Sequence, residues 1–222
     1  MRTEIEHHAR TETLASYAAG ALDEARSVVV ATHITRCPTC REAVRDFESL
    51  GGAMLENIEP APMSAGSLAS LWEMAGEQID APAGPVSPAA NDLDLEAAKP
   101  LRAYLNSSLD DIEWRPFAPG VSQHILEAEG YRKGVLRLIK IQPGTRLVRH
   151  THRDEEVTLI LRGAYEDEIG EFRAGDLADL DDGVVHSPRA VGDEPCICVI
   201  ATNAPLVFKG VVGKVLQPFV RM

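Results

Sequence analysis

Apolar residues in the first third of the chain recur at helical spacing, with breaks that predict three helices in succession. The first helix starts near residue 11 and can end at Gly20, because glycine tolerates the backbone conformation that often follows a helix. A second helix starts after Leu22 and runs to His33 or slightly beyond. Pro38 favours the first turn of a third helix, which we expect to reach about Asn57.

A short fourth helix is predicted after the break at residues 59–62, Glu-Pro-Ala-Pro, with Ser67 as a suitable cap. We expect it to be detached from the other three helices. An apolar stripe on such a helix either packs against its own domain or binds a partner protein, and periodicity leaves both possibilities open. The stripe consists of Leu68, Leu71, Trp72 and Ala75.

The pattern changes after residue 80. Residues 81–99 are rich in proline and read as a semi-extended linker. Beyond residue 100, short apolar or alternating runs such as 135–141, 157–161 and 196–201 are separated by glycines, which is typical of an all-β sandwich or barrel. We therefore predict a two-domain, α plus all-β protein with a helical domain at 1–80, a linker at 81–99 and an all-β domain at 100–222.

The chain carries 22 Lys and Arg against 34 Asp and Glu, a formal net charge of −12. This charge disfavours direct nucleic-acid binding but is compatible with a basic protein partner. The first ten residues lack the apolar core of a signal peptide, and no run approaches the roughly 18 apolar residues of a membrane helix. We expect a cytoplasmic protein that does not contact membranes, in which paired cysteines serve metal or redox chemistry.

One group of candidate metal ligands lies at the junction of the second and third helices. His33, Cys37 and Cys40 form H-x3-C-x2-C, and Cys40 falls in the first turn of a helix, where backbone donors favour thiolate over thiol. Zinc suits such mixed nitrogen and sulfur ligands, and the fourth ligand is either His7 or His8. The alternative is an unmetallated redox pair of cysteines beside a surface histidine.

The segment His33-Ile34-Thr35-Arg36-Cys37-Pro38-Thr39-Cys40, preceded by Tyr17-Ala18-Ala19-Gly20 and an early histidine, resembles the zinc-binding anti-sigma domain over the first third of the chain. The resemblance implies that three helices hold zinc. It also implies that a flexibly attached fourth helix helps to cover the surface of a sigma factor that would otherwise engage RNA polymerase core. The stripe on the predicted fourth helix is the corresponding partner-binding candidate.

A second group of candidate ligands lies in the all-β part. Residues 144–163 read G-x5-H-x-H-x3-E-x6-G, with His150, His152 and Glu156 at equal parity, so that on one extended strand they share a face. A later strand or loop can add His186, and the set accepts Zn, Fe, Mn or Ni. The alternative, two exposed strand histidines, leaves the spaced glycines and Glu156 unexplained.

This motif resembles the first signature of the cupin family, which implies a cupin barrel with a metal site. The second cupin motif is matched less completely. Gly175, Gly183 and His186 fit its frame, but Asp181 stands where cupins usually have proline and Ala190 where they often have asparagine.

Cys196 and Cys198 are separated by one residue on a predicted strand, so their side chains point to the same face. A disulfide across that spacing would be strained. We interpret them first as buried small apolar residues and second as possible redox sensors.

A zinc anti-sigma domain joined through a proline-rich linker to one cupin resembles the ChrR type of anti-sigma factor over nearly the whole chain. The resemblance implies a 1:1 complex with an extracytoplasmic-function sigma factor, a cupin that responds to oxidative signals such as singlet oxygen, and no enzymatic activity. It implies His8, His33, Cys37 and Cys40 as zinc ligands, and His150, His152, Glu156 and His186 as ligands of zinc or another divalent transition metal.

The sequence leaves two alternative functions. A metal-dependent cupin enzyme, such as a dioxygenase or isomerase with a helical oligomerisation module, is the main alternative, since three histidines and a carboxylate leave room for exogenous ligands. A zinc-finger DNA-binding protein is disfavoured by the acidic net charge.

Overall fold

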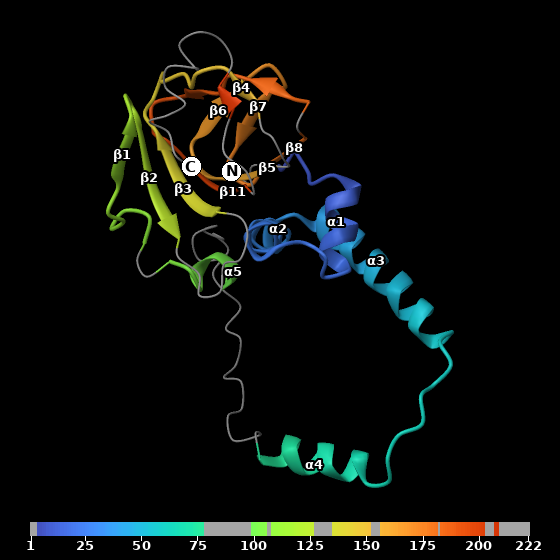
Figure 1. Cartoon of the computed structure of the whole chain (residues 1–222). Coiled ribbons are helices and arrows are strands. Elements are labelled where there is room, and N and C mark those ends of the chain that lie inside the picture. Colours follow the sequence, from blue (N-terminus) through green and yellow to red (C-terminus); the bar gives the residue numbers. More distant parts are fainter. Residues whose placement is uncertain are drawn as a thin grey trace.

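The computed structural model describes residues 4–77, 99–105, 108–126, 135–151, 156–181, 183–202 and 207–208. Helices come first along the chain and lie below a body of β-strands in Figure 1. The helices are α1 (Thr11–Ala18), α2 (Glu24–Arg36), α3 (Pro38–Glu56), α4 (Ser67–Glu77) and α5 (Lys99–Arg102). This order confirms the predicted combination of a helical N-terminal region with an all-β C-terminal region; the short helix α5 was not predicted.

The helix boundaries follow the local signals in the sequence. Gly20 lies two residues beyond α1 with a φ of 65°, a conformation that residues with a Cβ rarely adopt. Asp23 caps α2, and its carboxylate accepts a hydrogen bond of 3.0 Å from the backbone N–H of Arg26. Pro38 opens α3, and Cys37 before it is the N-cap residue. Thus α2 and α3 are separated by a single residue, a candidate metal ligand.

The strands form three sheets in which every pairing is antiparallel. The largest has six strands in the order β1-β2-β3-β11-β5-β8, and the two three-stranded sheets have the orders β10-β6-β7 and β12-β4-β9. The strands are β1 (Arg115–Ala118), β2 (Val121–Leu126), β3 (Val135–Ile141), β4 (His150–Thr151), β5 (Glu156–Arg162), β6 (Ala164–Glu166), β7 (Glu171–Arg173), β8 (Leu177–Leu180), β9 (Val185–His186), β10 (Arg189–Val191), β11 (Cys196–Thr202) and β12 (Val207–Phe208).

Two apolar cores lie on opposite faces of the six-stranded sheet. Alternate residues of β11 divide between them: Val199 belongs to the core shared with the helices, and Cys198 to the core between the sheets. Because both faces of β11 and β5 are covered, these strands read as nearly continuous apolar runs. The helical core includes Val29 and Val30 of α2, both fully buried. Helix α2 therefore packs on the sheet as well as on its neighbouring helices.

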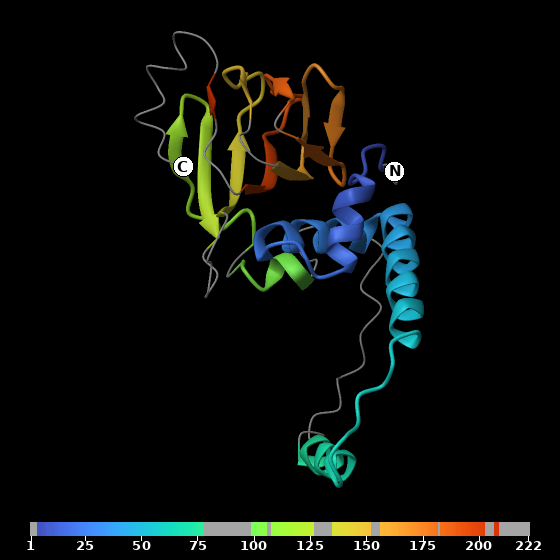
Figure 2. The same cartoon turned by 45° about the vertical axis from the view of Figure 1, so that its right-hand side comes forward.

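Helix α4 lies away from the rest of the described protein in both Figure 1 and Figure 2, as expected for a detached fourth helix. Helix α3 extends from beneath the β body in the same direction. Of the helices in the described part of the chain, none is long and apolar enough to span a membrane.

Candidate metal centres

The first candidate centre joins the N-terminal segment to the junction of α2 and α3. Ligand atoms of His8, His33, Cys37 and Cys40 all lie within 4.8 Å of one another. His8 Nδ1 is 3.2 Å from Cys37 Sγ and 3.7 Å from Cys40 Sγ, and His33 Nε2 is 3.3 Å from Cys40 Sγ. Zinc bonds of about 2.0–2.3 Å in a tetrahedron place ligand atoms roughly 3.3–3.8 Å apart. The four residues therefore have the spacing and chemistry of a metal site.

The structure distinguishes between the two early histidines. The His7 ring stacks on Phe172 with ring centroids 4.0 Å apart, and its Nε2 lies 3.0 Å from the carbonyl oxygen of Glu171. His8, the next residue, points to the other side of the segment and joins the cluster. The placement agrees with the ligand set that the family resemblance implies.

Burial shifts the pKa values of two ligands of this cluster, His33 and Cys40. It lowers the pKa of the His33 imidazole to about 4, so this side chain is neutral at pH 7 and has a lone pair for a cation. Burial raises the pKa of the Cys40 thiol to about 12. Cys37 Sγ accepts a hydrogen bond of 3.4 Å from the backbone N–H of Cys40. A cation bound here offsets the burial of negative sulfur.

A turn of the β body supports this centre from outside. His33 Nδ1 lies 3.0 Å from the carbonyl oxygen of Gly175, which can only accept, so Nδ1 carries the hydrogen and Nε2 carries the lone pair. A second hydrogen bond of this kind fixes both the tautomer and the orientation of a ligand histidine. The sequence analysis connected Gly175 only with the cupin motif.

The residue after Gly175 holds the segment that carries His8. Asp176 is 3% exposed, and its Oδ1 accepts hydrogen bonds from the backbone N–H groups of Glu6 at 2.8 Å and His7 at 3.1 Å. Its Oδ2 accepts from the backbone N–H of Arg173 at 2.8 Å. We call residues 173–177 the Asp176 turn. Through it, the β body orients two of the four candidate ligands.

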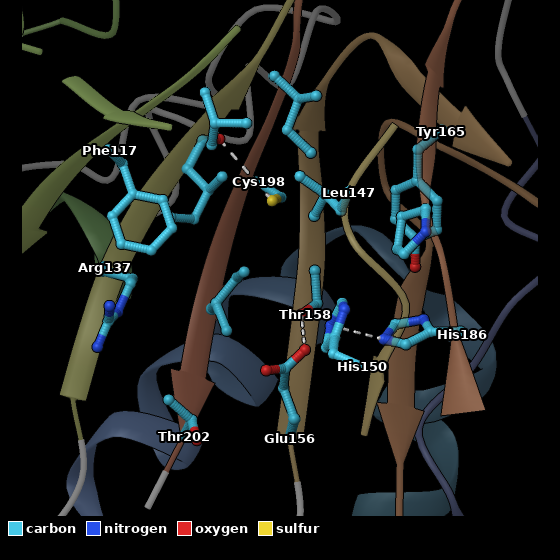
Figure 3. Close-up of a pocket in the computed structure, with 15 residues that line it drawn as sticks. Phe117, Arg137, Leu147, His150, Glu156, Thr158, Tyr165, His186, Cys198 and Thr202 are labelled. Carbon is cyan, nitrogen blue, oxygen red and sulfur yellow. Dashed lines mark hydrogen bonds between the residues drawn. The ribbon is translucent and has the colours of Figure 1, made fainter. Parts of the chain in front are cut away.

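A second candidate centre lies inside the β body, where Figure 3 shows His150 and His186 facing each other. Their Nε2 atoms are 3.1 Å apart. His150 Nδ1 donates to the carbonyl oxygen of Val148 at 2.8 Å, and His186 Nδ1 lies 2.9 Å from Asp167 Oδ2. When both Nδ1 atoms carry hydrogen, two Nε2 lone pairs face one another, an arrangement that a proton or a metal cation between them stabilises.

Asp167 was not identified from the sequence. Burial acts to raise its pKa, but hydrogen bonds from His186 and from the backbone N–H groups of Ile169 and Gly170 outweigh burial and lower the pKa below its ordinary value. The ionised carboxylate is suited to orient His186, as carboxylates beside metal-binding histidines do. Such a supporting residue lies outside the cupin spacing rules and has no local sequence pattern of its own.

The expectation that His150 and Glu156 share one extended strand is wrong. His150 lies on β4, which pairs with β9, whereas Glu156 begins β5 in the six-stranded sheet. Equal parity therefore does not place them on one face of a strand. Both nevertheless line the same cavity, together with His186. His152 lies outside the described residues.

The two centres differ in how closely their ligands approach. Within the described ranges, the helical cluster is the one group of three or more potential metal ligands with all ligand atoms within 4.8 Å. His150, Glu156 and His186 do not form such a group in the described part of the chain. In the second cupin motif, Asp181, which stands where cupins usually have proline, accepts a hydrogen bond of 3.0 Å at Oδ1 from the backbone N–H of Gly183.

The cysteine pair on β11 is buried in the core between the sheets. Burial raises the pKa of Cys196 to about 12 and that of Cys198 well above its ordinary value. The side chains lie on one face of the strand, as expected. Because protonated thiols are poor nucleophiles, these observations favour a packing role for the pair.

The apolar stripe of α4 is exposed and does not pack on its own domain: Leu68, Leu71 and Trp72 are 61%, 56% and 69% exposed, and Ala75 is also exposed. Sequence analysis missed that exposure continues from α3. Nine of the twelve exposed large apolar residues in the described part fall at residues 50–74. We call them the apolar strip: Leu50, Met54, Leu55, Ile58, Met63, Leu68, Leu71, Trp72 and Met74.

Comparison with known proteins agrees with this architecture. A model of the ChrR cupin-like domain matches residues 105–205. The anti-sigma-E factor ChrR of Cereibacter sphaeroides is 40% identical over 218 residues, which cover 98% of this chain and 99% of that protein. The crystal structure of Rhodobacter sphaeroides SigE in complex with the anti-sigma ChrR contains a chain with 39% identity and a TM-score of 0.74, covering 90% of this chain and 99% of that chain.

The fold and the two centres define a class of protein in which a helical module with a His and Cys cluster is packed on a cupin-like domain. Near full-length similarity then identifies the family. The chain belongs to the ChrR family of anti-sigma factors.

Proposed function

We propose that this protein is a cytoplasmic anti-sigma factor that binds an extracytoplasmic-function sigma factor in a 1:1 complex and keeps it from RNA polymerase core. The observation that carries the proposal is the 40% identity over nearly the full length to a protein named as an anti-sigma factor. In this proposal residues 1–80 bind the sigma factor, residues 81–99 link the domains, and residues 100–222 form the regulatory cupin.

The apolar strip supports this function. Monomeric proteins rarely concentrate so many exposed apolar side chains in one segment unless a partner covers them. The stripe of Leu68, Leu71, Trp72 and Ala75 on α4 is suited to lie in an apolar groove of the partner. The net charge of −12 complements a basic partner, such as a protein that itself binds nucleic acid.

We propose that zinc occupies the helical centre, with His8, His33, Cys37 and Cys40 as ligands. Three of the ligand-atom spacings, 3.2, 3.3 and 3.7 Å, are close to those of a zinc tetrahedron, and two thiolates with two imidazoles are a zinc-preferring set. The bound ion would join three pieces of chain: the segment before α1, the end of α2 and the start of α3. It would thereby support the helices that carry the apolar strip.

We propose zinc or another divalent transition metal in the cupin, held by His150, His152, Glu156 and His186. The facing Nε2 atoms of His150 and His186 support a cation at this point. In this proposal an oxidative signal such as singlet oxygen acts on the cupin. Cys196 and Cys198 remain a second-ranking redox candidate because their thiols are buried.

The Asp176 turn supports communication between the two centres. It contacts His33 and the segment that carries His8, and its last residue, Leu177, begins β8 of the cupin-like domain. A change in the cupin can alter the affinity for the sigma factor only if the turn has two conformations that differ in how strongly they stabilise the helical centre. Rearrangement of the turn is therefore our proposed route from signal to release.

Co-expression with a candidate extracytoplasmic-function sigma factor, followed by isolation of the complex and metal analysis, tests the proposal. Trp72→Ala should weaken sigma binding by about 2 kcal/mol or more, since buried aromatic residues dominate interfaces. Ile125→Ala, a matched change at a residue 50% exposed on β2, should leave binding unchanged. Absence of a complex, or equal affinity of the two variants, would contradict an anti-sigma function through this surface.

The alternative of a cupin dioxygenase or isomerase predicts that the helices mediate self-association. We favour a protein without enzymatic activity, because the full-length relative is an anti-sigma factor. Turnover of a substrate by the purified protein would support the alternative.

A further inference from the structure

The sulfur-containing side chains of the described residues divide between core and surface. The four cysteines are all buried. The methionines of the described residues, Met54, Met63 and Met74, are 65%, 68% and 64% exposed, and all three belong to the apolar strip. A small oxidant dissolved in water therefore reaches the methionine sulfur atoms more readily than the thiols.

The three methionines are spread along the whole apolar strip. Met54 lies on α3 four residues after Leu50, so the two side chains are neighbours on the helix surface. Met74 lies on α4 three residues after Leu71 and extends the stripe on that side. Met63 lies in the segment between the two helices. A partner that covers the apolar strip therefore covers sulfur on both helices and between them.

Oxidation of methionine changes the apolar character on which such a surface depends. A lone pair of the thioether sulfur attacks one oxygen of hydrogen peroxide, the O–O bond breaks, and the sulfur keeps that oxygen as a sulfoxide. The sulfur loses two electrons and the peroxide gains them. The proton of the transferred hydroxyl group joins the leaving hydroxide to give water. The sulfoxide is polar, and burying it in an apolar interface without a hydrogen-bond partner is unfavourable.

We propose that Met54, Met63 and Met74 are peroxide-sensitive sites, and that their oxidation to sulfoxides weakens binding of the sigma factor. This inference rests on the proposed function, because it requires that the sigma factor covers the apolar strip. In the complex the partner shields the sulfur atoms, so peroxide acts mainly on the free protein and prevents it from binding again. This route acts directly on the binding surface and needs no rearrangement of the cupin.

Affinity of the full chain for a candidate extracytoplasmic-function sigma factor, measured before and after treatment with hydrogen peroxide, tests the inference. Oxidised protein should bind about tenfold or more weakly. Methionine sulfoxide reductases should restore the affinity, whereas dithiothreitol alone, which reduces disulfides, should not. Unchanged affinity after complete oxidation of the three methionines overturns the proposal.

The matched control is the triple variant Met54→Leu, Met63→Leu and Met74→Leu, because leucine has nearly the size and apolar character of methionine but contains no sulfur. This variant should bind the sigma factor as tightly as the unmodified protein, and it should keep that affinity after peroxide treatment. An equal loss of affinity in the treated triple variant overturns the proposal, because the oxidised group then lies elsewhere.

A second measurement needs only the unmodified protein and decides the question if the triple variant does not bind. Partially oxidised protein is passed over immobilised sigma factor, and the bound and unbound fractions are compared by mass spectrometry. Sulfoxides at the three methionines should be enriched in the unbound fraction, and equal content in both fractions overturns the proposal. Absence of binding before any peroxide treatment contradicts the proposed function itself, whereas binding that resists oxidation contradicts this inference alone.

Discussion

Replacing Asp176 by Asn perturbs the helical metal centre from the β body without changing a candidate ligand. In the native protein Asp176 Oδ1 accepts hydrogen bonds from the backbone N–H groups of Glu6 and His7, directly before His8. Asn keeps one acceptor oxygen but loses the negative charge. It also turns an NH2 group toward one of the backbone N–H donors, for example that of Arg173.

The magnitude follows from the change in these bonds. Hydrogen bonds to a charged group contribute about 1.5–3 kcal/mol each, and neutral ones about 0.5–1.5 kcal/mol. The two bonds to Oδ1 therefore weaken by about 2–3 kcal/mol together. If most of this loss appears as poorer positioning of His8, zinc affinity falls 10–100-fold, about 1.4–2.7 kcal/mol, as is usual when a supporting contact of a metal ligand is removed.

Replacing zinc by cobalt allows the metal affinity of the helical centre to be measured separately from that of the cupin. Charge-transfer absorption from thiolate to Co²⁺ reports on the helical centre, since that centre contains Cys37 and Cys40, and the proposed cupin ligands contain no sulfur. Competition between zinc and bound cobalt, under reducing conditions at pH 7.5, then yields the zinc affinity of this one centre.

Asp110→Asn is the matched control, because Asp110 forms an exposed ion pair with Arg162 on another part of the β body. Its zinc affinity should equal that of the unmodified protein. Equal affinity in Asp176→Asn, with the cupin still cooperatively folded, would refute the idea that the Asp176 turn positions the ligands. If the unmodified protein shows no cobalt–thiolate band, the zinc assignment itself fails.

Four further predictions concern the metal centres and the buried thiols. His8→Ala should lower zinc affinity of the helical centre at least 100-fold by the cobalt assay, and His7→Ala should leave it within threefold; a reversed order contradicts the ligand assignment. Asp167→Asn should weaken metal binding in the cupin about 10–100-fold by metal analysis under chelator competition, with the cobalt–thiolate band unchanged. Cys196 and Cys198 should alkylate slowly at pH 8 in the folded protein, since a pKa of about 12 for Cys196 leaves about a thousandfold less thiolate than an ordinary thiol. Because the pKa of Cys196 is raised in the folded protein, the buried neutral thiol contributes fully to stability below pH 9, and this contribution is lost progressively between about pH 9 and 12. Alkaline unfolding of the unmodified protein, compared with that of Cys196→Ala, checks this loss. Rapid alkylation of both cysteines at pH 8, mapped by mass spectrometry, would contradict their burial.

Sequence alone located most of the helical centre because the determinants are local. His33, Cys37 and Cys40 fall within eight residues, and Pro38 sets the boundary between the two helices that hold them. The same reasoning left His7 and His8 open, since both precede the first helix and local rules treat them alike. Phe172 and the Asp176 turn decide between them, and these groups lie more than 160 residues further along the chain.

In the cupin-like region, motif spacing identified residues that meet in one cavity, but it did not establish their strands. Parity predicts a shared face only within one continuous strand, and His150 and Glu156 lie in different sheets. The support from Asp167 also became visible only when distant strands were brought together.

Composition and local pattern thus determined the helical and all-β regions, the boundaries of the helices and the three ligands within one short segment. One available indication was not used: α2 contains three consecutive valines beginning at Val28, and a helix apolar on several sides is covered on several sides. Only the tertiary structure showed that α2 shares its core with the six-stranded sheet and that Gly175 and Asp176 orient two metal ligands. The reason is physical: a backbone carbonyl is the same in every residue, so its value as a hydrogen-bond acceptor depends on where the folded chain places it.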